Sequence, residues 1–414
     1  MYALAAMADM YHDSDEALTH VLGDTGALWD QHEIDLALFF ASPHFAPHYS
    51  EMLQQVRAVT GARLLLGCSG QGIIGKTREA EGIPAVSLLV ASLPGADLRP
   101  VRITQPLLAE LDTPEAWHAW TGADPDATNA WMLFADPFRL DCEALLEALS
   151  AAYPGVPVVG GLASSAPTAQ RTQVFLHDRA YGDGAVAVAI GRALTIRAVV
   201  AQGSTPIGEP WTITGAEGNV ITSIGGRPAY ELLVDTLQGL PEELRQRARR
   251  NLLVGLAMNE YRDTFRRGDF LIRNLVGADP RTGALAVGAL PRVGQTLQFQ
   301  IRDAQAADDD LREHLAAARA ELGEQRPVAA LLCSCNGRGI GLFGSAHHDA
   351  GAVAEHLGPM PLAGFFCNGE IGPVGDRNFL HGYTASLALL VPSAPPPVSS
   401  RQQSAAREPD RGIL

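Results

Sequence analysis

The chain has 414 residues, of which 47% are hydrophobic, and a formal net charge of -15 at pH 7. Its length is sufficient for two domains with well-filled cores, since single cores stop growing at roughly 250 to 300 residues. The acidic balance argues against a surface built for nucleic acid or anionic membranes, because phosphate binding draws on clustered Lys and Arg.

The N-terminus and the cysteines indicate the compartment. The opening residues MYALAAMADMYHDSDEA lack the basic region and the unbroken apolar run of a signal peptide. No apolar run reaches the roughly 20 residues of a membrane span. The five cysteines are an odd number, which makes a disulfide framework unexpected. We therefore expect a cytoplasmic protein with reduced thiols and with neither nucleic acid nor membrane as a partner.

One pattern recurs three times along the chain: an apolar strand, a polar loop, an amphipathic helix that ends at a glycine, a second apolar strand, a Gly/Ser-rich loop and a third strand. The copies start with the strands at 35–45, 130–138 and 328–339, and their second strands lie in LLLGCSGQGIIG, VPVVGGLASS and PLAGFFCNGEIGP. Short, nearly all-apolar strands are typical of strands buried on both faces. The common order suggests duplication. The third helix is expected to open at Asp349.

Antiparallel signals lie between these copies. Residues 89–103 and 186–200 are predicted to be hairpins around short turns. Residues 211–237 alternate through a turn and then enter a helix near Pro228, and residues 270–304 contain three strands. The fold class is therefore α/β, with two related mixed-sheet domains built from repeated β-α-β-β units with antiparallel hairpin additions. Residues 393–414 contain too few apolar side chains to pack and are expected to be a disordered tail.

Together, LLLGCSGQGIIG, VPVVGGLASS, TITGAEGNVITSIGGRPAYELL, LLCSCNGRG and PLAGFFCNGEIGP make the chain resemble the paired N- and C-terminal FIST domains. The most specific pieces are CNGRG and GFFCNGEIGP. The resemblance implies a FIST N-like domain over residues 1–220 and a FIST C-like domain over 221–392. It also implies an intracellular sensory module of signal transduction that binds small ligands such as amino acids, and a signalling protein as a further partner.

Three of the five cysteines begin similar tetrads, Cys68-Ser69-Gly70-Gln71, Cys335-Asn336-Gly337-Arg338 and Cys367-Asn368-Gly369-Glu370. In open parallel sheets ligands bind outside the carboxyl ends of strands, where these loops would meet if the copies share a sheet. Arg338 would then bind a carboxylate and Glu370 an ammonium group, or the two side chains pair with each other. The predicted ligand-binding residues are Cys68, Ser69, Gly70, Gln71, Asn336, Arg338, Asn368, Gly369, Glu370 and His381.

Other readings of the same residues stay open. The cysteines can be small buried hydrophobes at strand ends. A thiol enzyme would need a base beside a thiolate, for which His177, His347, His348 and His381 are candidates. A protein-recruiting scaffold, like the F-box-linked relatives, is the third reading. We expect no catalytic residue, cofactor or metal, because neither match to G-x-G-x-x-G has the strand-to-helix context of a dinucleotide site and CSC followed by HH is no closed zinc pattern.

Overall fold

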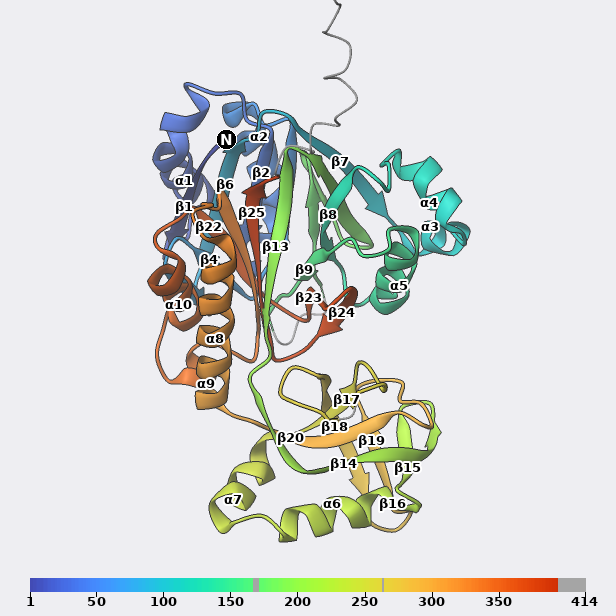
Figure 1. Cartoon of the computed structure of the whole chain (residues 1–414). Coiled ribbons are helices and arrows are strands. Elements are labelled where there is room, and N and C mark those ends of the chain that lie inside the picture. The colour runs from blue at the N-terminus through green and yellow to red at the C-terminus, as the bar shows by residue number, and fades with distance from the viewer. Residues whose placement is uncertain (167–170, 263, 394–414) are drawn as a thin grey trace, which may run out of the picture.

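The computed structural model describes residues 1–166, 171–262 and 264–393. The chain forms two bodies (Figure 1). The larger, called here the three-sheet body, contains residues 2–201 and 304–392, and the smaller, called the inserted module, contains residues 204–302. The predicted tail, apart from Ser393, lies outside the described residues.

The repeated pattern is confirmed, and each copy contains more than the sequence predicted: a strand and one or two helices precede the expected start. The first copy consists of β1 (Tyr2–Asp9), α1 (Ser14–Trp29), β2 (Leu36–Ala41), α2 (Tyr49–Thr60), β3 (Leu64–Ser69), β4 (Gly72–Gly75), β5 (Arg78–Glu81) and β6 (Ala85–Ser92), with a short helical turn η1 (Pro43–His48) before α2. The second consists of β7 (Ala96–Ile103), α3 (Gln105–Glu110), α4 (Pro114–Thr121), β8 (Thr128–Ala135), α5 (Cys142–Ala152), β9 (Val158–Leu162), β10 (Val174–Leu176), β11 (Arg179–Tyr181) and β12 (Ala185–Arg192).

The third copy is interrupted by the inserted module. It consists of β13 (Leu194–Ala201), α8 (Ala304–Leu322), β21 (Ala329–Cys335), α9 (Ile340–Phe343), α10 (His348–Leu357), β22 (Leu362–Cys367), β23 (Glu370–Val374), β24 (Arg377–His381) and β25 (Ala385–Pro392). The α10 helix starts one residue before the predicted opener, Asp349, whose carboxylate accepts hydrogen bonds from Arg338 and does not cap the helix.

The three copies exchange hairpins. The strand orders are β1-β6-β2-β3-β10-β11, β7-β12-β8-β9-β23-β24 and β13-β25-β21-β22-β4-β5. Each sheet therefore contains four strands of one copy and a hairpin from another. The first sheet receives β10–β11 from the second copy, the second receives β23–β24 from the third, and the third receives β4–β5 from the first. Within each sheet one pair is parallel, β2 with β3, β8 with β9 and β21 with β22. The α/β class with mixed sheets is confirmed.

The two hairpins predicted at 89–103 and 186–200 are wrong. The strands and turns are present, but β6 pairs with β1 and β2 whereas β7 pairs with β12. Likewise β12 pairs with β7 and β8 whereas β13 pairs with β25. Both turns carry the chain from one sheet to the next. Alternation and turn residues indicate strands and a reversal, but they contain no information about which strand becomes the neighbour.

The inner faces of the three sheets share one central core. At its centre the rings of Phe40, Phe134 and Phe365 contact one another, with centroid separations of 5.0, 5.4 and 5.8 Å. The outer faces are covered by helices: α1 and α2 on the first sheet, α3 to α5 on the second, and α8 and α10 on the third (Figure 1). This arrangement buries the central strands on both faces, as their apolar sequences predict.

A glycine repeats at one position of the parallel pairs. Gly67, Gly160 and Gly364 lie opposite Phe39, Leu133 and Leu332. A Cβ atom at any of the three would overlap the carbonyl oxygen of the residue opposite. The two backbones approach so closely that only glycine fits.

The inserted module is an antiparallel sheet with two helices. It contains β14 (Ser204–Glu217), β15 (Val220–Ile224), β16 (Arg227–Pro228), α6 (Ala229–Gln238), α7 (Glu242–Asn251), β17 (Leu252–Ala257), β18 (Phe270–Asp279), β19 (Ala284–Val287) and β20 (Thr296–Arg302). Because β14 pairs with both β20 and β15, six of its strands form a closed ring. The strands predicted within 211–237 and 270–304 are confirmed, as is the helix predicted near Pro228, which is α6. The predicted division between residues 220 and 221 falls within β15.

In the part of the chain described, no helix combines the length and the apolar character needed to cross a membrane.

Candidate functional site

The loops at the ends of β3, β9 and β22 are joined by hydrogen bonds, although the three strands lie in three different sheets and not in the shared sheet on which the prediction depended. Ser69 is the last residue of β3, and its Oγ donates a hydrogen bond to the Ser164 carbonyl at 2.9 Å. Ser164, just after β9, donates from Oγ to the Phe366 carbonyl at 2.5 Å and accepts from the Gln71 amide at 2.7 Å. Ser164 thus connects all three copies. Sequence reasoning did not select it because its loop lacks the cysteine tetrad; its place after VVGGLA is the signal that could have found it.

Two amides form the polar surface of this junction. The Asn336 side chain donates to Asn368 Oδ1 at 2.8 Å, and Asn368 donates to the Ala163 carbonyl at 3.1 Å. The glycines of the predicted site lie inside instead. Gly70 packs against Phe365, and Gly369 packs between Leu162 and Leu380. Cys68 belongs to the central core.

Arg338 and Glu370 do not pair with each other. Arg338 forms a two-point ion pair with Asp349, with Nε 2.7 Å from Oδ2 and Nη2 2.8 Å from Oδ1, and both side chains are buried. Burial alone would raise the pKa of Asp349, but the Arg338 charge and hydrogen bonds hold that pKa below its ordinary value. His348 and Ser334 also hydrogen-bond this carboxylate. The guanidinium predicted to bind a ligand carboxylate is therefore occupied by a carboxylate of the protein.

Glu370 is fully buried at the base of the β23–β24 hairpin. Its Oε1 accepts from the Cys367 thiol at 3.1 Å and its Oε2 accepts from the Thr384 amide at 3.0 Å. Burial raises the pKa of Glu370 to about 8, so the side chain is largely uncharged at neutral pH. His381 lies opposite it, with Nε2 donating to the Gly372 carbonyl at 3.0 Å, and burial lowers its pKa to about 4. Neither side chain offers a charge to a ligand.

The thiols are in environments that suppress reactivity. Burial raises the pKa of Cys68, Cys333 and Cys367 well above the ordinary value, and raises that of Cys142 and Cys335 to about 12. Across residues 1–166, 171–262 and 264–393, no histidine nitrogen is hydrogen-bonded to a thiol; Cys367, for example, donates to Glu370 and to the Ser334 carbonyl. The Asp136 carboxylate accepts from the amides of Phe138 and Arg139 in its own loop.

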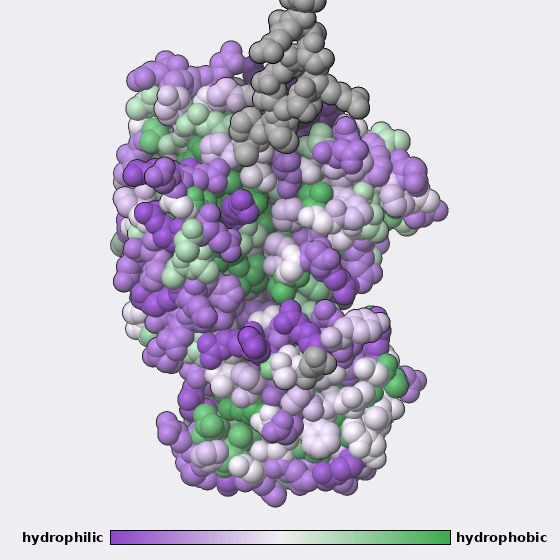
Figure 2. All heavy atoms as spheres, in the orientation of Figure 1, coloured by the Kyte–Doolittle hydropathy of each residue, from purple (hydrophilic) through white to green (hydrophobic). Residues whose placement is uncertain are grey.

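The two bodies enclose open space at the tip of the β23–β24 hairpin. Figure 2 shows a constriction between the three-sheet body and the inserted module, with hydrophilic residues on both sides. A cleft of about 590 Å³ lies there, lined by residues 258–262, Asp269 and Arg292 of the module and by the β23–β24 turn, residues 374–377, with Phe379. A second cavity of about 330 Å³ shares Met258, Arg292, Arg377 and Phe379 with it. The sequence contained no local signal for this cleft, since its walls come from segments more than eighty positions apart.

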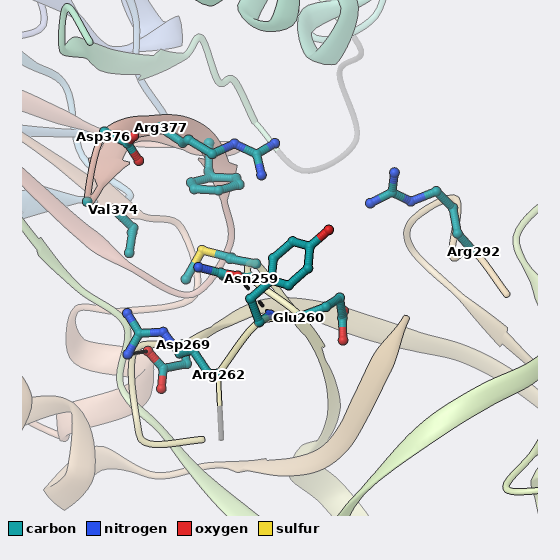
Figure 3. A pocket seen from close by; sticks show the side chains of 12 residues that line it. Asn259, Glu260, Arg262, Asp269, Arg292, Val374, Asp376 and Arg377 are labelled. Carbon is teal, nitrogen blue, oxygen red and sulfur yellow. Dashed lines mark hydrogen bonds and ion pairs between the residues drawn. The ribbon is translucent and has the colours of Figure 1, made fainter. Parts of the chain in front are cut away.

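Three of the six charged side chains that line the cleft have polar partners in the described residues. Arg262 pairs with Asp269 at 3.0 Å, and Glu260 accepts from the amide and the hydroxyl of Thr296 at 3.0 and 2.6 Å. Arg292 and Arg377 differ: in the described residues neither guanidinium forms an ion pair or hydrogen bond with another side chain or the backbone. Figure 3 shows the two guanidinium groups pointing toward each other across the open space, one from each body.

The module is also tied to the base of the hairpin. The Tyr383 hydroxyl donates to Asn274 of β18, and the Arg302 guanidinium lies 5.4 Å from the Tyr383 ring centroid. Arg273 donates to the Leu380 carbonyl at 2.9 Å. The strand-end loops, the hairpin and the module therefore form one continuous region, with the cleft at the hairpin tip.

Family models match two adjoining stretches of the chain, the FIST N domain over residues 35–227 and the FIST C domain over residues 229–373. This chain belongs to the FIST family. It is 40% identical over 356 residues to an uncharacterized protein of Mycobacterium tuberculosis (strain ATCC 25618 / H37Rv), covering 86% of this FIST chain and 91% of that protein. An uncharacterized protein of Mycobacterium bovis is 37% identical, with 86% and 90% covered. Among solved structures, cyanuric acid hydrolase from A. caulinodans is similar with a TM-score of 0.35 and 11% identity, covering 95% of this chain and 100% of that one.

Proposed function

We propose that this FIST protein is a small-ligand-binding sensory module and that the ligand binds in the cleft between the three-sheet body and the inserted module. The observation that carries this proposal is the cavity of about 590 Å³ whose walls come from both bodies. Its size lies within the roughly 300 to 1,000 Å³ typical of small-molecule sites, and clefts between domains are frequent positions for such sites.

The position of the cleft supports a sensory role. The module is joined to the body through two short connections, β13 to β14 and β20 to α8. A ligand that contacts both walls binds one relative orientation of the two bodies more tightly than others. Differential affinity of this kind is what allows a ligand to shift a conformational equilibrium.

The proposed ligand is an amino acid or a related metabolite, in keeping with the family resemblance, but its contacts differ from those expected. The charged members of the strand-end tetrads are bonded within the protein, so we place the ligand at the tip of the hairpin that these loops position. Glu370 and His381 at the base are about four residues, or roughly 13 Å of extended chain, from the turn. We propose binding rather than catalysis, a proposal supported by the raised pKa values of the thiols.

A thermal-shift screen of the full chain tests the proposal. The panel contains anionic, zwitterionic and uncharged metabolites, each at constant ionic strength. A ligand at a hundredfold excess over its dissociation constant is expected to stabilise the fold by about 2.7 kcal/mol. Small-angle X-ray scattering on the responding mixture should show a more compact particle. A folded protein that responds to no class in the panel would overturn the proposal.

A further inference from the structure

We infer that the cleft selects a small dianion, a dicarboxylate or a phosphate monoester, held between Arg292 and Arg377. This inference rests on the proposed function and names the chemical class of the ligand at the same site. Arg292 belongs to the loop between β19 and β20 of the module, and Arg377 is the first residue of β24 in the body. The two cations therefore come from opposite walls of the cleft.

Two guanidinium groups that point into one space repel each other, and the repulsion is weakened when an anion lies between them. Each guanidinium can donate two parallel hydrogen bonds to a carboxylate or a phosphate group. In the described residues neither the Arg292 nor the Arg377 guanidinium donates a hydrogen bond to a carboxylate of the protein. A ligand with a negative charge at each end could pair with Arg292 on one wall and with Arg377 on the other at the same time.

The other charged side chains of the cleft include two carboxylates, Glu260 and Asp376, that form no ion pair within the described residues. Arg262 and Asp269 neutralise each other, and Glu260 is held by Thr296. The third carboxylate, Asp376, lies at the hairpin turn near Val374 and not between the two guanidinium groups (Figure 3). An ammonium group placed between the two guanidinium groups would be repelled by both, which at that position disfavours simple zwitterions relative to dianions.

The cleft also has an apolar part. Met258 and Phe379 line both cavities, and Tyr261 is 98% exposed. A short carbon skeleton between two charged ends would cover part of this surface. The combination favours an organic dianion over an inorganic ion.

The test compares four probes on the full chain at constant ionic strength: succinate, glycerol 3-phosphate, alanine and succinamide. We expect one or both dianions to raise the melting temperature. A response to succinate would indicate a dicarboxylate ligand, and a response to glycerol 3-phosphate would indicate a phosphate ester. Alanine and uncharged succinamide should leave it unchanged. Arg292→Gln and Arg377→Gln, which keep hydrogen-bonding amides but lose the charge, should each weaken dianion binding at least tenfold by calorimetry.

The control variant is Arg281→Gln, which removes a 90% exposed arginine of the same module that does not line the cleft. This variant should bind the dianion with the same affinity as the unchanged protein. A response to alanine or succinamide alone would overturn the dianion inference and leave the proposed function standing. Dianion binding that persists in both cleft variants would overturn the assignment to these arginines. No response to any probe, here and in the broader panel, would overturn both proposals.

Discussion

The guanidinium of Arg338 and the carboxylate of Asp349 form a forked ion pair, with each side chain only 1% exposed to solvent. The pair joins the loop after β21 to the first turn of α10. Removal of two ions from water is costly, and their mutual attraction offsets that cost only while both are present. Arg338 therefore stabilises the fold by holding the loop after β21 against α10, through its ion pair with Asp349.

Arg338→Leu should destabilise the fold by about 3 to 5 kcal/mol, because it leaves the Asp349 carboxylate buried without a counterion. The double variant Arg338→Met with Asp349→Leu should recover most of that loss. Urea unfolding measures both, with Arg319→Leu on the exposed surface of α8 as the control. A stable Arg338→Leu protein that has lost only its ligand response would instead assign Arg338 to the binding site.

Glu370 should make stability fall as the pH rises from about 5 to 8. Its folded pKa is about 8, above the ordinary value of 4.5, so over this interval the folded chain keeps a proton that the unfolded chain releases. Glu370→Gln removes this titration. Urea unfolding at several pH values should show the stability difference between the variant and the unchanged protein moving in favour of the variant as pH increases. A difference that is the same at pH 5 and pH 8 would contradict the assignment.

Gly364→Ala should cost roughly 3 kcal/mol or more, or prevent folding, because its Cβ would overlap the Leu332 carbonyl oxygen on the paired strand. The matched control is Gly351→Ala in α10, where no atom lies within 4 Å of the added carbon. That change should stabilise the helix by up to about 1 kcal/mol. Equal denaturant midpoints for the two variants would show that the strands have room to separate at this position.

The thiols should be inert in the folded protein. Burial raises the pKa of Cys367, so little thiolate exists at neutral pH and the sulfur is shielded from reagents. We expect iodoacetamide at pH 7.5 to leave Cys68, Cys333 and Cys367 unmodified in the native chain and to label all five cysteines in urea. Mass spectrometry of peptides locates the label. Rapid native labelling of Cys367, suppressed by a metabolite, would favour a thiol enzyme.

The candidate site contains some features that local sequence patterns predict and one that they do not. The strand ends were predictable, because apolar runs that stop at Ser69, Ser164 or Asn368 place polar loops at one edge of the sheets. The ionic partner of Arg338 was not predictable, because Asp349 looked like a helix opener and only the packing of α10 against β21 decided its use. A carboxylate in the first turn of a helix fits both roles equally well.

By itself the sequence determined the three copies, the two-sided burial of their strands and the turns between them, since periodicity and glycine positions are local properties of the chain. Only the tertiary structure decided that hairpins are exchanged among the copies and that the module contributes one wall of a cleft. Arg292 and Arg377 are separated by 84 intervening residues and share no pattern. They face one space because strand pairing and domain insertion are decided by long-range packing, which no short stretch of sequence encodes.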